Sequence, residues 1–166
     1  MSLNIGVTGH RDIVVTKKLR TEIENYLETL IYTHRDEEIY LLSPLAEGAD
    51  RLVAEIFLAF QSYYPNLYLI VPIPFEQRRY MEDFDRASKH EFWTYTRQAK
   101  RLFCVEDTQG DGYRSVGVFV ADRSDILLAL WDGTDNHKAG GTADIVKYAK
   151  AQGKEVKHFL TQRQGG

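Results

Sequence analysis

The sequence predicts an α/β fold of three layers, in which helices flank a mainly parallel sheet. Short apolar runs alternate along the chain with longer segments whose apolar side chains recur at helical spacing. This alternation implies right-handed strand–helix–strand crossovers, which produce a parallel sheet covered on both faces. The length of 166 residues is typical of one domain. We therefore expect a single domain over residues 1–161 and a frayed tail over residues 162–166.

Apolar runs predict the strands in order along the chain. The first, at 3–8, is closed by Gly9, and the second, at 39–42, is followed by Ser43-Pro44. The third, at 67–72, ends before Pro74, because proline disrupts a strand interior. Further strands are expected at 102–105, 125–131 and 156–160.

Helices are predicted between these strands. Thr16 occupies an N-cap position ahead of a helix at 17–34, and apolar spacing predicts a second helix at 49–60. The charged and aromatic segment that follows is interpreted as two short helices, at 76–86 and 88–100. A turn-rich stretch at 106–112 precedes a helix at 113–122. The last helix, at 142–152, ends at Gly153, which is a natural C-cap.

The composition is that of an ordinary globular protein, with 43% hydrophobic and 27% charged residues. A formal net charge of −3 provides no global basic field, so nucleic acid is not expected as a partner. Arg78-Arg79 and Arg97–Arg101 are candidate local basic patches, which we interpret as solvated helix faces.

The sequence carries no membrane or secretion signal. No apolar run approaches the roughly 20 residues of a membrane-spanning helix, and the N-terminus lacks a basic region followed by a long apolar core. The single cysteine, Cys104, cannot form an internal disulfide, and its apolar neighbours predict a buried, inert thiol. We therefore expect a cytoplasmic protein without a membrane partner.

The turn after the first strand is a candidate phosphate-binding loop. Gly9 permits close backbone approach, Thr8 and the amides that follow it, at His10 and beyond, donate to phosphate oxygens, and Arg11 offers a bidentate fork. The alternative is a plain strand-to-helix turn in which Arg11 and Asp12 form a surface pair.

The loop after the strand at 125–131 is a second candidate. Asp132 ends the strand, and Gly140, Gly141 and Thr142 precede a helix whose N-terminus attracts anions. The alternative is that these residues only cap the start of the helix and bind no ligand.

Carboxylates follow the second strand at the start of its helix. Gly48 exposes backbone amides there, and Glu47 and Asp50 are candidates for binding ribose hydroxyls. The alternative, which applies above all to Asp50, is that they are simply first-turn carboxylates that interact favourably with the helix dipole.

An aromatic and acidic segment follows the third strand. Tyr80 and Asp83 are candidates for base or ribose contacts in a lid. The alternative is a half-exposed helix pair with Phe84 and Phe92 in the core.

These pieces together resemble the SLOG superfamily, whose Rossmann-like domains are related to the lonely-guy (lysine-decarboxylase-like) phosphoribohydrolases and to molybdenum-cofactor carrier proteins. The sequence is most similar to a bacterial branch of that superfamily. The motifs that carry the resemblance are VTGHRD at 7–12, LAEGADRLVAE at 45–55, YxxDF at 80–84, EF at 91–92, and ALWDG with GGTA between 129 and 143. The resemblance implies a nucleotide or nucleotide-derived ligand, a sensor or regulatory role, and a homodimer as a candidate assembly.

The sequence departs from the hydrolase branch of the superfamily where catalysis would occur. That branch has Pro-Gly-Gly-x-Gly-Thr-x-x-Glu, whereas Ile145 stands at the position of its final Glu. The nearest carboxylate is Asp144, and successive helical residues point about 100° apart. Binding is therefore the leading hypothesis, and the hydrolase activity is not transferred.

The alternative hypothesis is an enzyme that cleaves the N-glycosidic bond of a nucleoside monophosphate. Its candidate catalytic carboxylates are Glu47, Asp132 and Asp144, with Arg11 holding the phosphate. No cofactor is expected besides the nucleotide-derived ligand. The histidines show no metal-ligand spacing, so no metal site is expected either.

Overall fold

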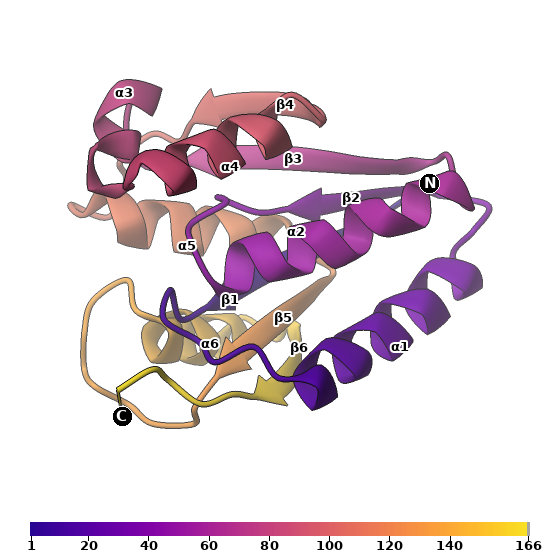
Figure 1. Cartoon of the computed structure of the whole chain (residues 1–166). Helices are drawn as coiled ribbons and strands as arrows, with labels where there is room; N and C mark the ends of the chain where they lie inside the picture. The colour runs from indigo at the N-terminus through magenta and orange to yellow at the C-terminus, as the bar shows by residue number, and fades with distance from the viewer. Residues whose placement is uncertain (166) are drawn as a thin grey trace.

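The computed structural model describes residues 1–165, which form one sheet of six strands together with six α-helices and two short 3₁₀ helices (Figure 1). The strands are β1 (Ser2–Gly9), β2 (Glu38–Leu42), β3 (Leu67–Ile73), β4 (Ala99–Cys104), β5 (Ile126–Trp131) and β6 (Glu155–Leu160). The α-helices are α1 (Lys17–Thr33), α2 (Ala49–Ala59), α3 (Gln77–Tyr80), α4 (Arg86–Thr96), α5 (Gly112–Arg123) and α6 (Thr142–Ala151). The 3₁₀ helices are η1 (Phe60–Ser62) and η2 (Met81–Asp83). No helix within residues 1–165 is long and apolar enough to cross a membrane.

The strand order is β4-β3-β2-β1-β5-β6, and every neighbouring pair is parallel. The predicted parallel α/β fold is therefore confirmed. From β1 the chain first builds outward through β2 to β4 and then returns to place β5 on the other side of β1. The carboxyl ends of β1 and β5 thus flank the point where the strand order reverses, which is where open parallel sheets bind their ligands.

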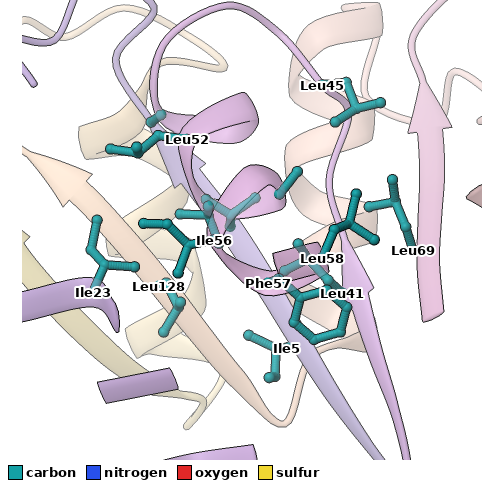
Figure 2. Packing of buried hydrophobic residues seen from close by; sticks show 14 of the residues in the cluster. Ile5, Ile23, Leu41, Leu45, Leu52, Ile56, Phe57, Leu58, Leu69 and Leu128 are labelled. Atoms are coloured by element: carbon teal, nitrogen blue, oxygen red, sulfur yellow. The ribbon is translucent and has the colours of Figure 1, made fainter. Parts of the chain in front are cut away.

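Helices cover both faces of the sheet, so the molecule has three layers (Figure 1). Helices α1, α2 and α4 lie on one face, and their buried side chains form one apolar core with the strands. Figure 2 shows part of this core, where Phe57 of α2 and Ile23 of α1 pack over Ile5 and Leu128. Helices α5 and α6 cover the other face with a smaller core. Burial of β1, β2 and β5 between these layers explains their apolar sequences.

Two predictions fail between residues 76 and 104. The expected helix at 76–86 is broken into α3 and η2, and the expected helix at 88–100 stops at Thr96 because β4 begins at Ala99. Strand β4 lies at the edge of the sheet and is largely exposed, which accounts for its charged, weakly patterned sequence. Cys104 at its end is exposed, not buried as predicted.

The C-terminal segment is attached to the molecule where fraying was expected. Ile13 and Arg163 form an antiparallel bridge, and the amide of Gln164 donates to the carbonyl of Asp12 at 2.8 Å. Ile13 itself is buried, with 2% of its surface exposed, so it anchors the pairing. These contacts attach residues 162–164 to the segment that follows β1, and Gly166 lies outside the described residues.

Phe57 is fully buried in the larger core, and we expect Phe57→Ala to lower the free energy of unfolding by about 3–5 kcal/mol because it leaves a cavity. Urea unfolding followed by circular dichroism measures the change. Tyr63→Ala is the control, because Tyr63 is 79% exposed and its loss should cost less than about 0.5 kcal/mol. Equal losses in the two variants would contradict the assignment of this core.

Candidate ligand-binding site

A cavity of about 430 Å³ opens at the carboxyl ends of β1, β2, β3 and β5. Its walls come from the segments that follow these strands and from α5, which crosses behind them. The volume falls within the range of about 300–1,000 Å³ that is usual for small-molecule sites. The cavity lies at the reversal of strand order, as the topology predicts for a parallel sheet.

Most of the site residues expected from the sequence line this cavity. Those that do so are Thr8, Gly9, His10, Arg11, Tyr80, Asp83, Gly140, Gly141 and Thr142. Three other predicted residues, Glu47, Gly48 and Asp132, do not line the cavity but contact the lining residues Arg11 or His10. The turn after β1 and the loop ahead of α6 are thus neighbours in the fold, although His10 and Thr142 are 132 residues apart in the sequence.

The start of α6 is the feature of the cavity best suited to an anion. Gly141 is the N-cap and supplies no side-chain hydrogen bond to the helix. The first backbone N–H groups of a helix have no intrahelical partner and carry the positive end of its dipole. Because Gly141 and Thr142 line the cavity, this uncapped helix end opens onto it. The two other helices that begin here differ, since Asp111 caps α5 and the His10 carbonyl accepts from the first amide of α2.

An ion pair fixes the loop ahead of α6. Asp144 accepts a hydrogen bond from Arg114 Nε at 2.9 Å, and its same oxygen accepts the Gly140 amide at 2.8 Å. The carboxylate of Asp144 therefore ties the glycine loop to α5 and does not line the cavity. This contact positions Gly140 and Gly141 but removes Asp144 as a carboxylate facing a ligand.

Three cationic side chains line the cavity. Arg11 is paired with Glu47 and Arg163 with Asp12, at 2.6 and 2.8 Å. Lys138 is exposed and forms no ion pair within residues 1–165. Its carbonyl accepts the Gly141 amide at 3.0 Å, so the lysine belongs to the same loop as the open helix end. Lys138 is thus the cation left to neutralise an anion bound there.

The turn after β1 packs too tightly to accept side chains at two positions. A Cβ atom on Gly9 would lie 2.4 Å from the Ala49 Cβ atom, and one on Gly48 would lie 2.5 Å from the Arg11 carbonyl oxygen. Gly48 also has φ of 79°, a conformation that other residues adopt at a cost. The two glycines therefore allow the β1 turn to contact the start of α2 directly.

His10 links this turn to β5 and α6 from a buried position, with 9% of its surface exposed. The Asp132 amide lies 3.3 Å from its Nε2 atom, and Thr142 Oγ1 lies 3.5 Å from its Nδ1 atom. The amide and hydroxyl of Thr134 donate hydrogen bonds to the Asp132 carboxylate and hold its pKa below the ordinary value, and His10 lowers the pKa further. Asp132 thus serves the turn at the end of β5 and braces His10, and it does not line the cavity.

Glu47 is engaged by arginine at the edge of the site. Burial acts to raise the pKa of Glu47, but the hydrogen bonds from Arg11 and Ser88 and the charges of Arg11 and Arg51 outweigh it. The pKa of Glu47 is therefore below its ordinary value, and the group remains an ionised partner of Arg11.

Asp50 is a buried carboxyl group in the cavity wall, and the sequence did not predict that burial. It lines the cavity but is 7% exposed, and its Oδ2 atom accepts the Ala46 amide at 3.2 Å. Burial raises its pKa to about 7, although the Ala46 hydrogen bond and the charges of Arg51 and Arg11 oppose the rise. At neutral pH this group can accept or donate a proton, unlike an ordinary first-turn carboxylate.

The aromatic segment after β3 belongs to the core and does not form a stacking lid. Tyr80, Phe84 and Phe92 are each less than 5% exposed and pack against one another edge to face or tilted. The Tyr80 hydroxyl donates to the Pro44 carbonyl at 3.0 Å, which holds the β2–α2 loop in place. Burial raises the pKa of Tyr80, so the hydroxyl stays protonated. Asp83 lines the cavity rim, where it accepts from the Tyr113 hydroxyl at 3.4 Å.

Ile145 lines the cavity at the position where the hydrolase branch has its catalytic Glu. It packs against α5 so closely that a Cβ atom on Gly117 would lie 2.5 Å from its Cδ1 atom. Val116 and Val120 continue this apolar wall. The three carboxylates considered for catalysis are all bonded elsewhere, Glu47 to Arg11, Asp132 to Thr134, and Asp144 to Arg114. The geometry therefore gives the hydrolase hypothesis no carboxylate at that position.

Arg163 and the α5 residues are lining residues that the sequence did not indicate. Arg163 reaches the cavity because the C-terminal segment pairs with residues 12–14. Tyr113 and Val116 reach it because α5 crosses the sheet beneath β1 and β3. Neither arrangement leaves a local sequence signal, although Asp111 followed by Gly112 does mark a helix start.

Comparison with known proteins shows similarity at the level of the fold. No protein-family model matches the sequence, and no protein of curated function matches it significantly. Among solved structures, DNA processing protein A (DprA) from Streptococcus pneumoniae is similar with a TM-score of 0.60 and 14% identity, over 94% of this chain and 50% of that one. The structure of TM1055 gives a TM-score of 0.48 and 14% identity, over 93% of this chain and 72% of that one. The chain thus has the fold of part of DprA and spans half of its length.

The raised pKa of Asp50 predicts a pH dependence of stability. Between pH 3.8 and about 7 the unfolded chain releases the Asp50 proton while the folded chain retains it, so the free energy of unfolding falls as pH rises. The slope is at most about 1.4 kcal/mol per pH unit. Asp50→Asn removes this dependence, so the variant should gain stability relative to the wild type across that window. Urea unfolding at a series of pH values measures the difference.

Asp36→Asn is the control for this prediction, because Asp36 is exposed and forms no ion pair in the described chain. Its pH profile should run parallel to that of the wild type. A parallel profile for Asp50→Asn as well would show that Asp50 is not protonated preferentially in the folded state.

Proposed function

We propose that the protein binds a nucleotide or nucleotide-derived ligand in this cavity and acts as a sensor or regulatory module. The observation that carries the proposal is the uncapped start of α6, which opens onto a cavity at the reversal of strand order together with Lys138, a lysine that forms no ion pair among residues 1–165. Helix N-termini of this kind bind phosphate through backbone amides and the helix dipole.

The remaining walls suit the other parts of such a ligand. Ile145, Val116 and Val120 offer an apolar surface for a base, and Asp83 and Asp50 offer acceptors for hydroxyl or amino groups. Arg11 and Arg163, each already balanced by a carboxylate, add donors without adding a large net charge. The site therefore combines an anion-binding end with an apolar wall.

The resemblance to the SLOG superfamily supports the same proposal. Its motifs at 7–12, 80–84 and 129–143 contribute Thr8–Arg11, Tyr80 and Gly140–Thr142 to the lining. The motif at 45–55 supplies the glycine and carboxylates of the α2 start. No resident cofactor is part of the proposal.

The proposal predicts stabilisation by ligand and its loss on charge reversal at Lys138. A panel of nucleoside mono- and diphosphates, cyclic nucleotides and ADP-ribose is tested by thermal shift, and a binder at 100 times its Kd should stabilise by about 2.7 kcal/mol. Lys138→Glu places a carboxylate beside the α6 start and should weaken binding at least tenfold, which removes about 1.4 kcal/mol of that stabilisation.

Lys89→Glu is the matched control, since Lys89 is exposed on α4 outside the cavity and the change in net charge is the same. It should bind like the wild type. If no member of the panel raises the melting temperature, the proposal is overturned. If the two variants bind the ligand equally weakly, the α6 start is not the anion-binding site.

A further inference from the structure

One half of the sheet is covered incompletely on the α5 side. On the α2 side, Leu41, Leu69 and Val71 are fully buried. On the opposite face of the same strands, Tyr40, Tyr68 and Ile70 remain partly exposed. Helix α5 lies over β1 and β3 and contacts β4 where Phe119 packs on Phe103, whereas α6 lies over β5 and β6, so the helices within residues 1–165 cover β2, β3 and β4 only in part on this face. Parallel sheets are normally covered on both faces, so this surface is the exception within the fold.

Two pairs of aromatic rings lie on this partly covered surface. Tyr40 and Tyr68 are cross-strand neighbours with ring centroids 5.3 Å apart. Phe103 of β4 packs on Phe119 of α5 at 5.6 Å. Between the two pairs lies Ile70, which is opposite Arg101 in the register of β3 and β4. The four rings thus belong to one surface.

Three cations accompany these rings. Lys100 Nζ lies 4.3 Å from the Tyr68 ring centroid, Arg101 lies over Phe103 at 4.8 Å, and Arg123 lies over Phe119 at 4.3 Å. All three side chains are exposed, and none forms an ion pair with a carboxylate among the residues that the structure describes. Glu38 is the carboxylate beside these rings, and it is engaged by the Tyr40 hydroxyl. We call the four rings and three cations the β4 patch.

We propose that the β4 patch binds single-stranded nucleic acid. Lysine and arginine neutralise phosphates along a single strand, while aromatic rings and guanidinium planes stack with its unpaired bases. The patch supplies both kinds of group on one face of the sheet. Arg101 and Lys100 belong to the basic stretch 97–101, whose interpretation as a helix face fails because these residues lie in β4.

The charges favour this partner over the other candidates for the surface. A second copy of the chain on the patch would bring the three unpaired cations of each copy together. An acidic peptide would satisfy the cations but would leave the rings without stacking partners. None of the seven residues of the β4 patch lines the cavity, so the proposal is independent of nucleotide binding there.

The test is fluorescence anisotropy of a labelled oligothymidylate or oligoadenylate of about 20 nucleotides, titrated with the full chain at low salt. Three phosphate contacts predict a slope of about −2 for the logarithm of the binding constant against the logarithm of salt concentration. A duplex of the same length should bind at least tenfold more weakly, because its bases are not free to stack. The double variant Lys100→Glu/Arg101→Glu should lose at least tenfold in affinity.

Lys17→Glu/Lys18→Glu is the matched control, because these lysines are exposed on α1 on the other face of the sheet and the net charge changes equally. Tyr68→Leu should weaken binding at least fivefold, whereas Tyr63→Leu, outside the patch, should not. Unchanged melting temperatures show that the variants fold. The proposal is overturned by absence of binding, by equal losses in patch and control variants, or by a dimer in sedimentation that the double variant dissociates.

Discussion

The close packing of the β1 turn between β5 and α2 is the constraint on which the site depends. The His10 amide donates to the Leu130 carbonyl and its carbonyl accepts the Ala49 amide, so one residue joins the end of β5 to the start of α2. No side chain fits at position 9 or 48, because a Cβ atom there would overlap Ala49 or the Arg11 backbone. The His10 ring then extends the link to Asp132 and Thr142. These contacts hold the ends of β1 and β5 against the starts of α2 and α6, and the cavity is the space that remains in front of them.

The electrostatics of the cavity are divided between its ends. The α6 start, with Lys138, presents amides and a cation that no neighbouring carboxylate neutralises, since Asp144 is turned toward Arg114. At the α2 start the situation is reversed, because the His10 carbonyl covers that helix end and the buried Asp50 has a pKa raised to about 7. An anionic group is therefore favoured at one end, and a neutral hydrogen-bonding group at the other. Such an asymmetric site suits a ligand that joins a phosphate to a polar, uncharged portion.

The two faces of the sheet differ in how completely helices cover them. Three helices cover the α2 side, where the larger core includes the aromatic cluster around Phe84. On the α5 side the helices stand over β1, β3, β5 and β6, and the aromatic side chains of β2, β3 and β4 are only partly covered, with cationic side chains of β4 exposed beside them. The cavity lies at the carboxyl ends of the strands, whereas the β4 patch lies on the face of β2, β3 and β4 that α5 covers in part, and the two share no residue. The fold thus provides two separate surfaces with different physical character.

The sequence by itself determined the architecture and most of the cavity lining. Apolar strands and amphipathic helices in alternation leave a parallel sheet as the way to bury both kinds of element, and glycine turns after strands must then meet at one edge. What only the tertiary structure decided is where individual polar groups point. Burial raises the pKa of Asp50, and the spacing of the sequence does not reveal that burial. Arg163 reaches the site because it pairs with Ile13, which lies 150 residues earlier in the chain. The last residues of the charged run at 97–101 begin the edge strand β4 because they pair with β3, and no local pattern specifies that partner. Secondary structure and turns follow from neighbours in sequence, whereas burial, charge pairing and exposed faces follow from neighbours in space.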